Sequence, residues 1–226
     1  MPMKFRKFHL LLSVLTFLVG IGVSYGERFL EKQIETHALS DCVLTYSEEP
    51  LVDERLDENA IYGTIIREQF VDKTTTFVTI EAMSTNCDIY ERGLDRTGPT
   101  PAEIFSGLRD SMSISKETTD SYVTKNQAPS EILLGDIGIN YRLVSAGEIK
   151  GYFDGRGKGW GEFYKKYPKS SGLIFFSRVG FNVQHNEAFL YVGHSCGGLC
   201  GSGGYISLKK LGTTWVIQNS EGVWES

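Results

Sequence analysis

The sequence predicts an α+β fold in which helices pack on one face of a mainly antiparallel sheet that ends in a four-strand C-terminal meander. The last third of the chain carries four segments of alternating apolar and polar residues, joined by the short links typical of antiparallel neighbours. The first two thirds carry helix-start signals and apolar residues at helical spacing. A sheet must bury at least one face, and the upstream helices are available to cover it.

Two short patterns predict helix starts upstream of the meander. The letters TPAE from position 100 combine an N-cap threonine, proline at the first helical position and glutamate three residues after the cap. The letters SAGE from position 145 form a second capping box, with serine at the cap and glutamate three residues later. The predicted helices cover 57–70, 100–112, 115–126, 145–153 and 160–167, and short strands cover 76–81 and 140–144. Four aromatic residues share one face of the last helix, a spacing that favours core packing over an exposed stacking platform.

The meander strands are predicted over 172–182, 187–195, 204–211 and 214–220. The second and third are joined by the glycine-rich stretch GHSCGGLCGSGG at 193–204, and the other links are 183–186 and 211–213. Arg178 lies in the first of these strands, opposite the face that carries Phe175, Val179 and Phe181. It is expected either to pair with a carboxylate on an upstream helix or to bind a ligand carboxylate from the open face of the sheet.

The first residues, 1–26, have the form of a secretory signal. Three basic residues precede an apolar run of 14 residues at 10–23, and a small-x-small pattern follows at 24–26. The run is short for a membrane-spanning helix, which needs about 20 residues. We therefore expect a cleaved signal peptide or, as the open alternative, an N-terminal anchor spanning residues 8–25. The protein is then exported, periplasmic or extracellular, and meets a membrane only through an uncleaved leader.

The remaining chain divides into an acidic, partly irregular lead-in at 27–56 and a single α+β domain at 57–226. The whole chain has 23 basic and 28 acidic residues; without the three basic residues of the leader it has 20 basic residues and a net charge of −8. An exported protein of this charge is a poor match for nucleic acid or for anionic lipid surfaces. We expect its partner to be an unidentified protein or small-molecule ligand.

Four cysteines in an oxidising compartment are expected to form two disulfides. Three connectivities are possible, and the two local pairings, Cys42 with Cys87 and Cys196 with Cys200, are favoured. The chain-entropy model gives about 2 kcal/mol for the short Cys196–Cys200 loop and about 4 kcal/mol for the long one. The short bridge therefore mainly fixes the shape of the glycine-rich loop.

Other interpretations of the glycine-rich stretch stay open. His194, Cys196 and Cys200 have an H-x-C-x3-C spacing, which differs from the usual C-x2-C of zinc sites and redox pairs. Ser195 lies in GHSCG, which has the G-x-S-x-G shape of a hydrolase nucleophile, with His194 or His185 as its base. A strand precedes this motif but no helix follows it. A clipped hairpin loop is therefore the leading interpretation, and no metal or cofactor is expected.

The C-terminal half resembles a widespread group of uncharacterised exported bacterial proteins. The motifs are W-x-x-F-Y-x-x-Y-P, S-R-V-G-F-N, C-G-x-L-C-G and a C-terminal tryptophan ending, within 141–226. Members that lack the cysteine pair keep the glycine turn, which favours a structural clip over a catalytic thiol. The chain departs from the group at its ending, where Glu225 follows Trp224. The resemblance implies no activity.

The function expected from these observations is a non-enzymatic binding or envelope-associated module stabilised by disulfides. The alternatives are a hydrolase that uses Ser195 and His194, or a thiol-redox or metal site at Cys196 and Cys200. Arg178 and His194 are the candidate ligand-binding residues.

Overall fold

The computed structural model describes residues 52–73, 75–85, 101–153 and 159–226. Within these ranges no helix is both long enough and apolar enough to cross a membrane. The leader and most of the predicted lead-in lie outside the described residues. The first described helix begins at Val52, so the last residues of the predicted lead-in are helical. Acidic residues in a first helical turn complement the helix dipole, and the acidic letters DE after Val52 therefore mark a helix start.

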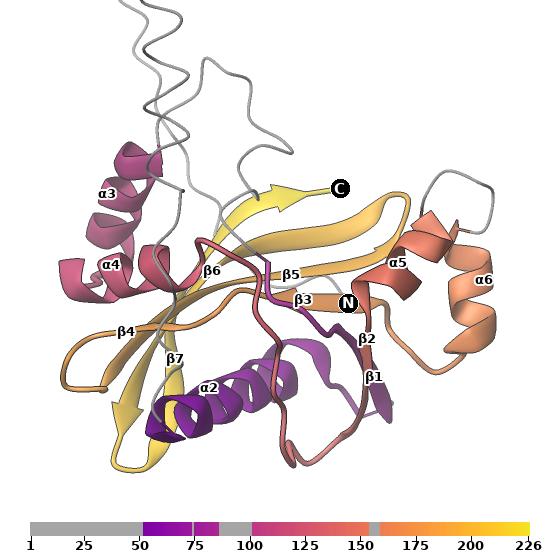
Figure 1. Cartoon of the computed structure of the whole chain (residues 1–226), viewed down its shortest axis with the longest axis horizontal. Coiled ribbons are helices and arrows are strands. Elements are labelled where there is room, and N and C mark those ends of the chain that lie inside the picture. Colours follow the sequence, from indigo (N-terminus) through magenta and orange to yellow (C-terminus); the bar gives the residue numbers. More distant parts are fainter. Residues whose placement is uncertain (1–51, 74, 86–100, 154–158) are drawn as a thin grey trace, which may run out of the picture. The chain divides into compact units, whose positions relative to one another are not determined.

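The helices and strands follow the order that the sequence predicts, except that one predicted strand is split in two (Figure 1). The helices are α2 (Val52–Ile65), which continues as a π-helical turn η1 (Ile66–Phe70), α3 (Pro101–Met112), α4 (Lys116–Lys125), α5 (Ala146–Phe153) and α6 (Gly159–Lys166). The strands are β1 (Phe77–Glu81), β2 (Asn140–Val144), β3 (Leu173–Phe176), β4 (Gly180–Phe181), β5 (Glu187–Gly197), β6 (Cys200–Leu211) and β7 (Thr214–Glu225). The predicted cap at Ser145 forms, because Ser145 Oγ accepts from Glu148 N at 3.2 Å, whereas the predicted cap at Thr100 lies outside the described residues. Ser115 caps α4 in the same way, since its Oγ accepts from Thr118 N at 3.2 Å.

The α+β class is confirmed, with a mixed sheet of seven strands in the order β2-β1-β3-β5-β6-β7 and β4 paired to β5. From β3 onward the pairing is antiparallel, as the meander prediction requires. The other edge is parallel, since β1 pairs in parallel with both β2 and β3. Helices connect these strands, and a helical crossover returns the chain in the same direction. The first predicted meander strand is split into β3 and β4.

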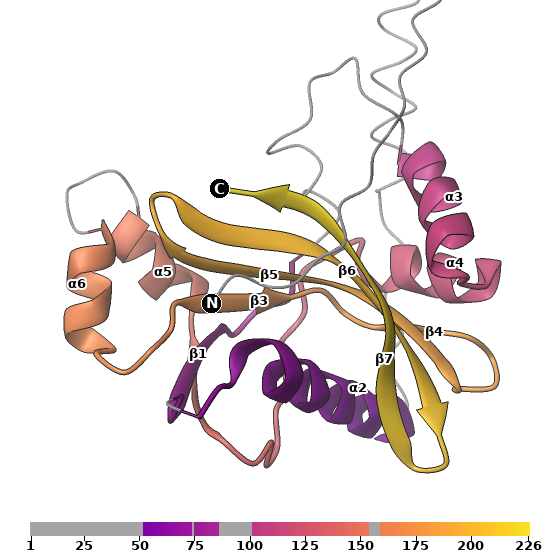
Figure 2. The ribbon, with the colours of Figure 1, turned by 180° about the vertical axis from the view of Figure 1, so that it is seen from behind.

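One face of the sheet packs against α2. Ile61, Tyr62, Ile65 and Ile66 are at most 1 % exposed and join the largest apolar cluster with inward residues of β1, β3, β5 and β6. Figure 2 shows α2 lying along this side of the sheet. On β5 the residues that reach this cluster are Ala188, Leu190 and Val192. These residues alternate along the strand, so their side chains share one face.

The second face is covered too, which corrects the prediction of helices on one face only. The alternate residues of β5, Phe189 and Tyr191, pack with Tyr205 and residues of α3 and α4 in a separate cluster. Helices α5 and α6 enclose a third cluster around Phe163 and Leu173, at the end of the sheet nearer β1 and β2 (Figure 1). The physical reason is visible in the letters AFLYV of β5. A strand that is apolar at every position buries both faces.

Glycines on β5 and β6 let aromatic rings lie against the second face. A Cβ atom at Gly193 would lie 2.1 Å from Phe175 Cε2, and one at Gly203 would lie 2.2 Å from Tyr191 Oη. Trp224 Nε1 donates a hydrogen bond to Tyr191 Oη at 2.6 Å beside Gly203. Burial raises the pKa of Tyr191 to about 12, so its hydroxyl stays protonated in this contact.

Gly203→Ala should lower the free energy of unfolding by about 1–3 kcal/mol because its Cβ would overpack the second face. The added atom would lie 2.2 Å from Tyr191 Oη and 2.3 Å from Trp224 Nε1. Gly107→Ala is the matched control, because its Cβ meets no atom within 4 Å in the exposed part of α3. This control should gain about 0.5–1 kcal/mol from helix propensity. Urea unfolding measures both, and a fully stable Gly203→Ala would contradict this packing.

Candidate functional site

The glycine-rich stretch forms the hairpin between β5 and β6. Strand β5 ends at Gly197 and β6 begins at Cys200, so two residues make the turn. Cys196 and Cys200 form a disulfide across it, with their Cα atoms 5.1 Å apart. Leu199 at the tip is 91 % exposed. The prediction of a clipped hairpin loop is confirmed for this pair, and in this form neither sulfur is a thiolate.

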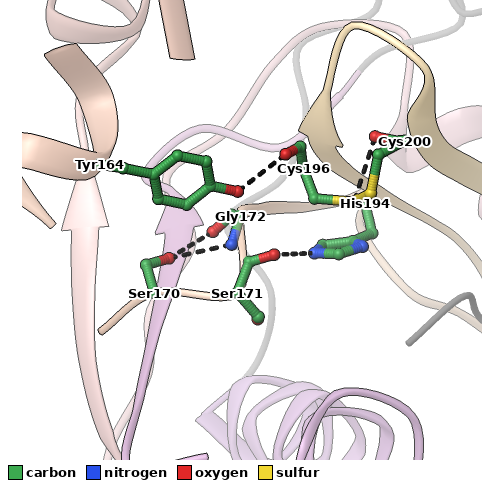
Figure 3. Close-up of a disulfide and its surroundings, with 7 residues drawn as sticks. All are labelled: Tyr164, Ser170, Ser171, Gly172, His194, Cys196 and Cys200. Atoms are coloured by element: carbon green, nitrogen blue, oxygen red, sulfur yellow. Dashed lines mark hydrogen bonds between the residues drawn. A yellow bond between two sulfur atoms is a disulfide. The ribbon is translucent and has the colours of Figure 1, made fainter. Parts of the chain in front are cut away.

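The base of this hairpin is held from outside the loop (Figure 3). Tyr164 of α6 donates from its hydroxyl to the Cys196 carbonyl oxygen at 2.9 Å. Gly172 has a φ of 129° and lies so close that a Cβ atom there would be 2.3 Å from the Ser195 carbonyl oxygen. Only glycine combines this backbone conformation with this approach. The hairpin therefore docks on the chain that leads into β3.

His194 is a core residue and lies apart from solvent. Its side chain is 3 % exposed, and its ring centroid is 5.3 Å from that of Phe70. Burial lowers the pKa of His194, although its bond to the Ser171 carbonyl oxygen, at 3.0 Å from Nε2, acts in the opposite direction. A carbonyl oxygen only accepts, so Nε2 carries the proton of a neutral imidazole. Figure 3 shows the ring directed at Ser171.

The structure does not bring a serine–histidine pair together here. His194 and Ser195 are successive residues of β5, so their side chains point to opposite faces of the sheet. His185 lies before β5, stacked on Phe181 with ring centroids 5.1 Å apart. About 25 Å of strand separates Glu187, which follows this histidine closely, from Ser195. Neither predicted base reaches the hydroxyl.

The other predicted cysteine pair, Cys42 and Cys87, lies outside the described residues, and its pairing stays a prediction. Among the residues that the structure describes, no group of three or more histidine, cysteine, aspartate or glutamate side chains is arranged to hold a metal ion.

Arg178 lies at the interruption between β3 and β4, not on an open strand face. Its Nε donates to both carboxylate oxygens of Glu58 on α2, at 2.9 Å and 3.2 Å, and both side chains are 9 % exposed. Burial alone would lower the pKa of Arg178, but the Glu58 carboxylate outweighs it and the pKa is raised. Of the two expectations for Arg178, pairing with an upstream helix is the one observed.

The same interruption is bound by α4 from the other face. Asn126, which is fully buried, accepts from Arg178 N at 2.8 Å and donates to Arg178 O at 3.0 Å. Tyr62 of α2 donates to Ser177 O at 2.9 Å, and Val179 N donates to Glu58 Oε1 at 3.2 Å. Side chains thus replace the strand partners that the backbone lacks at this point.

A hollow of about 250 Å³ lies where the α3–α4 turn meets β5, β6 and β7. Its lining is largely polar and comprises Met112, Ser113, Glu187, Ser207, Leu208, Lys209, Gln218 and Asn219. Ser207 is 4 % exposed, and its hydroxyl oxygen has no hydrogen-bond partner in the described structure. A buried polar atom without a partner is uncommon in folded proteins and calls for an explanation.

Glu187 is the acidic group of this hollow. Its Oε1 accepts from Ser115 N at 2.8 Å and from Thr118 Oγ1 at 2.6 Å, so it also caps α4. Burial would raise the pKa of Glu187, but these hydrogen bonds and the charge of Lys209 outweigh it and hold the pKa below its usual value. The carboxylate is therefore ionised at neutral pH.

Sequence reasoning missed this hollow. The available signal was the change along one face of β6, where Tyr205 is followed at alternate positions by Ser207 and Lys209. A serine in an inward position of an apolar strand marks a place where a polar partner is needed. The strand pattern alone does not predict that the turn after α3 forms the opposite wall of the hollow.

No family model matches the chain, and no curated protein or solved structure shows significant similarity to it. The resemblance to exported bacterial proteins therefore stays a prediction.

Arg178→Met should lower the free energy of unfolding by about 3–5 kcal/mol, because it leaves the Glu58 carboxylate buried without its partner. The double variant Glu58→Gln, Arg178→Met removes that charge and keeps an acceptor for Val179 N. It should be clearly more stable than the single variant in urea unfolding. If the double variant is no more stable than Arg178→Met, then Arg178 does not stabilise the protein by pairing with Glu58.

The free energy of unfolding should fall as the pH decreases below about 6.5, the ordinary pKa of histidine. The folded state holds the pKa of His194 below that value, so the unfolded chain takes up the proton first. The contribution of His194 to the free energy of unfolding is therefore complete above pH 6.5. It decreases as the pH falls from 6.5 to below the pKa of His194 in the folded state. Glu187 acts in the same direction but only below its ordinary value of 4.5. The measurement is denaturant unfolding at a series of pH values between 5 and 8. His194→Gln should reduce the loss of stability below pH 6.5, and an unchanged loss would refute its assignment to His194.

Proposed function

We propose that this protein is an exported, non-enzymatic binding module that takes a small polar ligand in the hollow beside the α3–α4 turn. The basic and apolar composition of residues 1–26 supports export to the periplasm or beyond. The Cys196–Cys200 bridge suits an oxidising compartment. Its role in this proposal is to hold the β5–β6 hairpin, not to react.

The observation that carries the proposal is the buried hydroxyl of Ser207. It has no hydrogen-bond partner among the described residues, and it lines a hollow whose walls are largely polar. Leaving a buried hydroxyl without a partner costs about 1–3 kcal/mol. A ligand that fills the hollow and bonds to Ser207 recovers that free energy, and the bare protein does not.

A binding role is favoured over catalysis because the reactive side chains serve the fold. His194 donates to Ser171 O, Arg178 is paired with Glu58, and Cys196 is bonded to Cys200. Among the residues that the structure describes, none of these groups forms the pair of nucleophile and general base that such catalysis requires.

The test is thermal unfolding of the protein with millimolar amino acids, amines, carboxylic acids, sugars and polyols. At least one class should raise the melting temperature, because a ligand that binds only the folded state stabilises it. Ser207→Ala should unfold at the same temperature as the unliganded wild type or at a higher one, since it removes a buried hydroxyl that has no partner. The variant should lose most of the ligand-induced shift. Ser195→Ala, in the hairpin, is the matched control and should keep the shift.

Absence of a shift in every class, or a shift that Ser207→Ala keeps in full, would refute the hollow as the binding site. Turnover of ester substrates that Ser195→Ala abolishes would instead support the hydrolase alternative.

A further inference from the structure

We infer that the hollow recognises a small zwitterion, with the ligand ammonium at Glu187 and the ligand carboxylate at Lys209. This inference rests on the proposed binding function and gives its ligand class.

The two charges of the hollow lie side by side. Glu187 on β5 and Lys209 on β6 are directly opposite each other in the strand register, so their side chains lie on the same face. Within the described ranges they form no ion pair with each other. The hydrogen bonds from Ser115 N and Thr118 Oγ1 both end on Oε1 of Glu187. The Lys209 ammonium has no ion-pair partner in the part of the chain that the structure describes.

A ligand with both charges satisfies this arrangement better than one with a single charge. A simple ammonium ion at Glu187 would meet the repulsion of the neighbouring Lys209, and a simple carboxylate at Lys209 would meet that of Glu187. A zwitterion places an opposite charge at each group and adds no net charge to a partly buried site. Specificity then follows from the repulsion of the wrong ligands as well as from the attraction of the right one.

The neutral polar groups fit the same orientation. Ser207 lies two residues before Lys209 on β6, so its hydroxyl is on the same face and can donate to the ligand carboxylate. Asn219 pairs with Ser207 in the register, and its Nδ2 donates to Met112 O at 3.0 Å. That bond fixes the amide and leaves its oxygen as a further acceptor for the ligand ammonium.

The size of the hollow limits the ligand. Its volume is about 250 Å³, below the roughly 300–1,000 Å³ of pockets for drug-sized ligands. One water occupies about 30 Å³ of liquid, so the space suits a molecule of amino-acid size. Glu187 is 9 % exposed and Ser207 is 4 % exposed, so these two groups lie at the inner wall, whereas Lys209 is exposed to solvent.

The test is isothermal titration calorimetry of the full chain with β-alanine, propylamine and propionate. These three probes share a three-carbon skeleton and differ only in their charged groups. β-Alanine should bind at least about tenfold more tightly than either analogue, since a tenfold change needs only about 1.4 kcal/mol, less than a charge-assisted hydrogen bond contributes. Lys209→Gln should weaken β-alanine binding at least about tenfold and bring it close to that of propylamine. Lys150→Gln, on exposed α5, makes the same charge change and should leave binding unaltered.

Glu187→Gln should also weaken β-alanine binding. Because Glu187 caps α4, thermal unfolding must first show that the Glu187→Gln variant is folded. If Glu187→Gln is unstable, the test is decided by Lys209→Gln alone. Equal binding of the three probes, or β-alanine binding that Lys209→Gln keeps, would overturn the zwitterion inference. If only a sugar or polyol binds, in a manner lost in Ser207→Ala, the inference fails and the proposed function stands. If no probe and no panel member binds, both fail.

Discussion

The structure depends on how the chain satisfies its backbone at Ser177–Val179, where the strand between β3 and β4 is interrupted. Helices from opposite faces of the sheet supply the missing partners: Glu58 and Tyr62 from α2, and Asn126 at the end of α4. Each of these side chains binds the interruption directly, so neither helix can shift without leaving buried polar groups unpaired. Gly180 allows this, because a Cβ atom there would lie 2.5 Å from the Thr118 carbonyl oxygen of α4. The two layers of helices are thereby joined through one short segment of the sheet.

The elements that are determined locally could be predicted from sequence. The cap at Ser145, the aromatic face of α6 and the hairpin at Cys196–Cys200 each follow from residues within one turn or one loop. The two-sided burial of β5 could also have been recognised, since the letters AFLYV lack polar alternation. The prediction of one covered face left the other face of β5 without a cover, and α3 and α4 provide it.

The parts that sequence reasoning missed, or gave only in outline, depend on distant pairs. The sequence predicts pairing of Arg178 with a carboxylate on an upstream helix as one of two alternatives, but Glu58 lies 120 residues away and no local pattern singles out this residue of α2 as the partner. The hollow is the same kind of feature. It combines Met112 and Ser113 at the end of α3 with Glu187, Ser207 and Asn219 from three strands, and only the sheet order places them together.

The polar hollow and the aromatic cluster share the second face, and their proximity has an energetic consequence. Glu187 is held at the start of α4 by Ser115 and Thr118, while the same helix packs Tyr122 against Phe189 with ring centroids 5.1 Å apart. The carboxylate that would meet a ligand is thus fixed before the ligand arrives. Recognition by a fixed group avoids the entropy of ordering a mobile one, which costs about 0.5–1.5 kcal/mol for each side chain immobilised on binding. The unpaired Ser207 beside it is the complementary part of this arrangement, because its polarity costs stability in the free protein and gains a partner only when the hollow is filled.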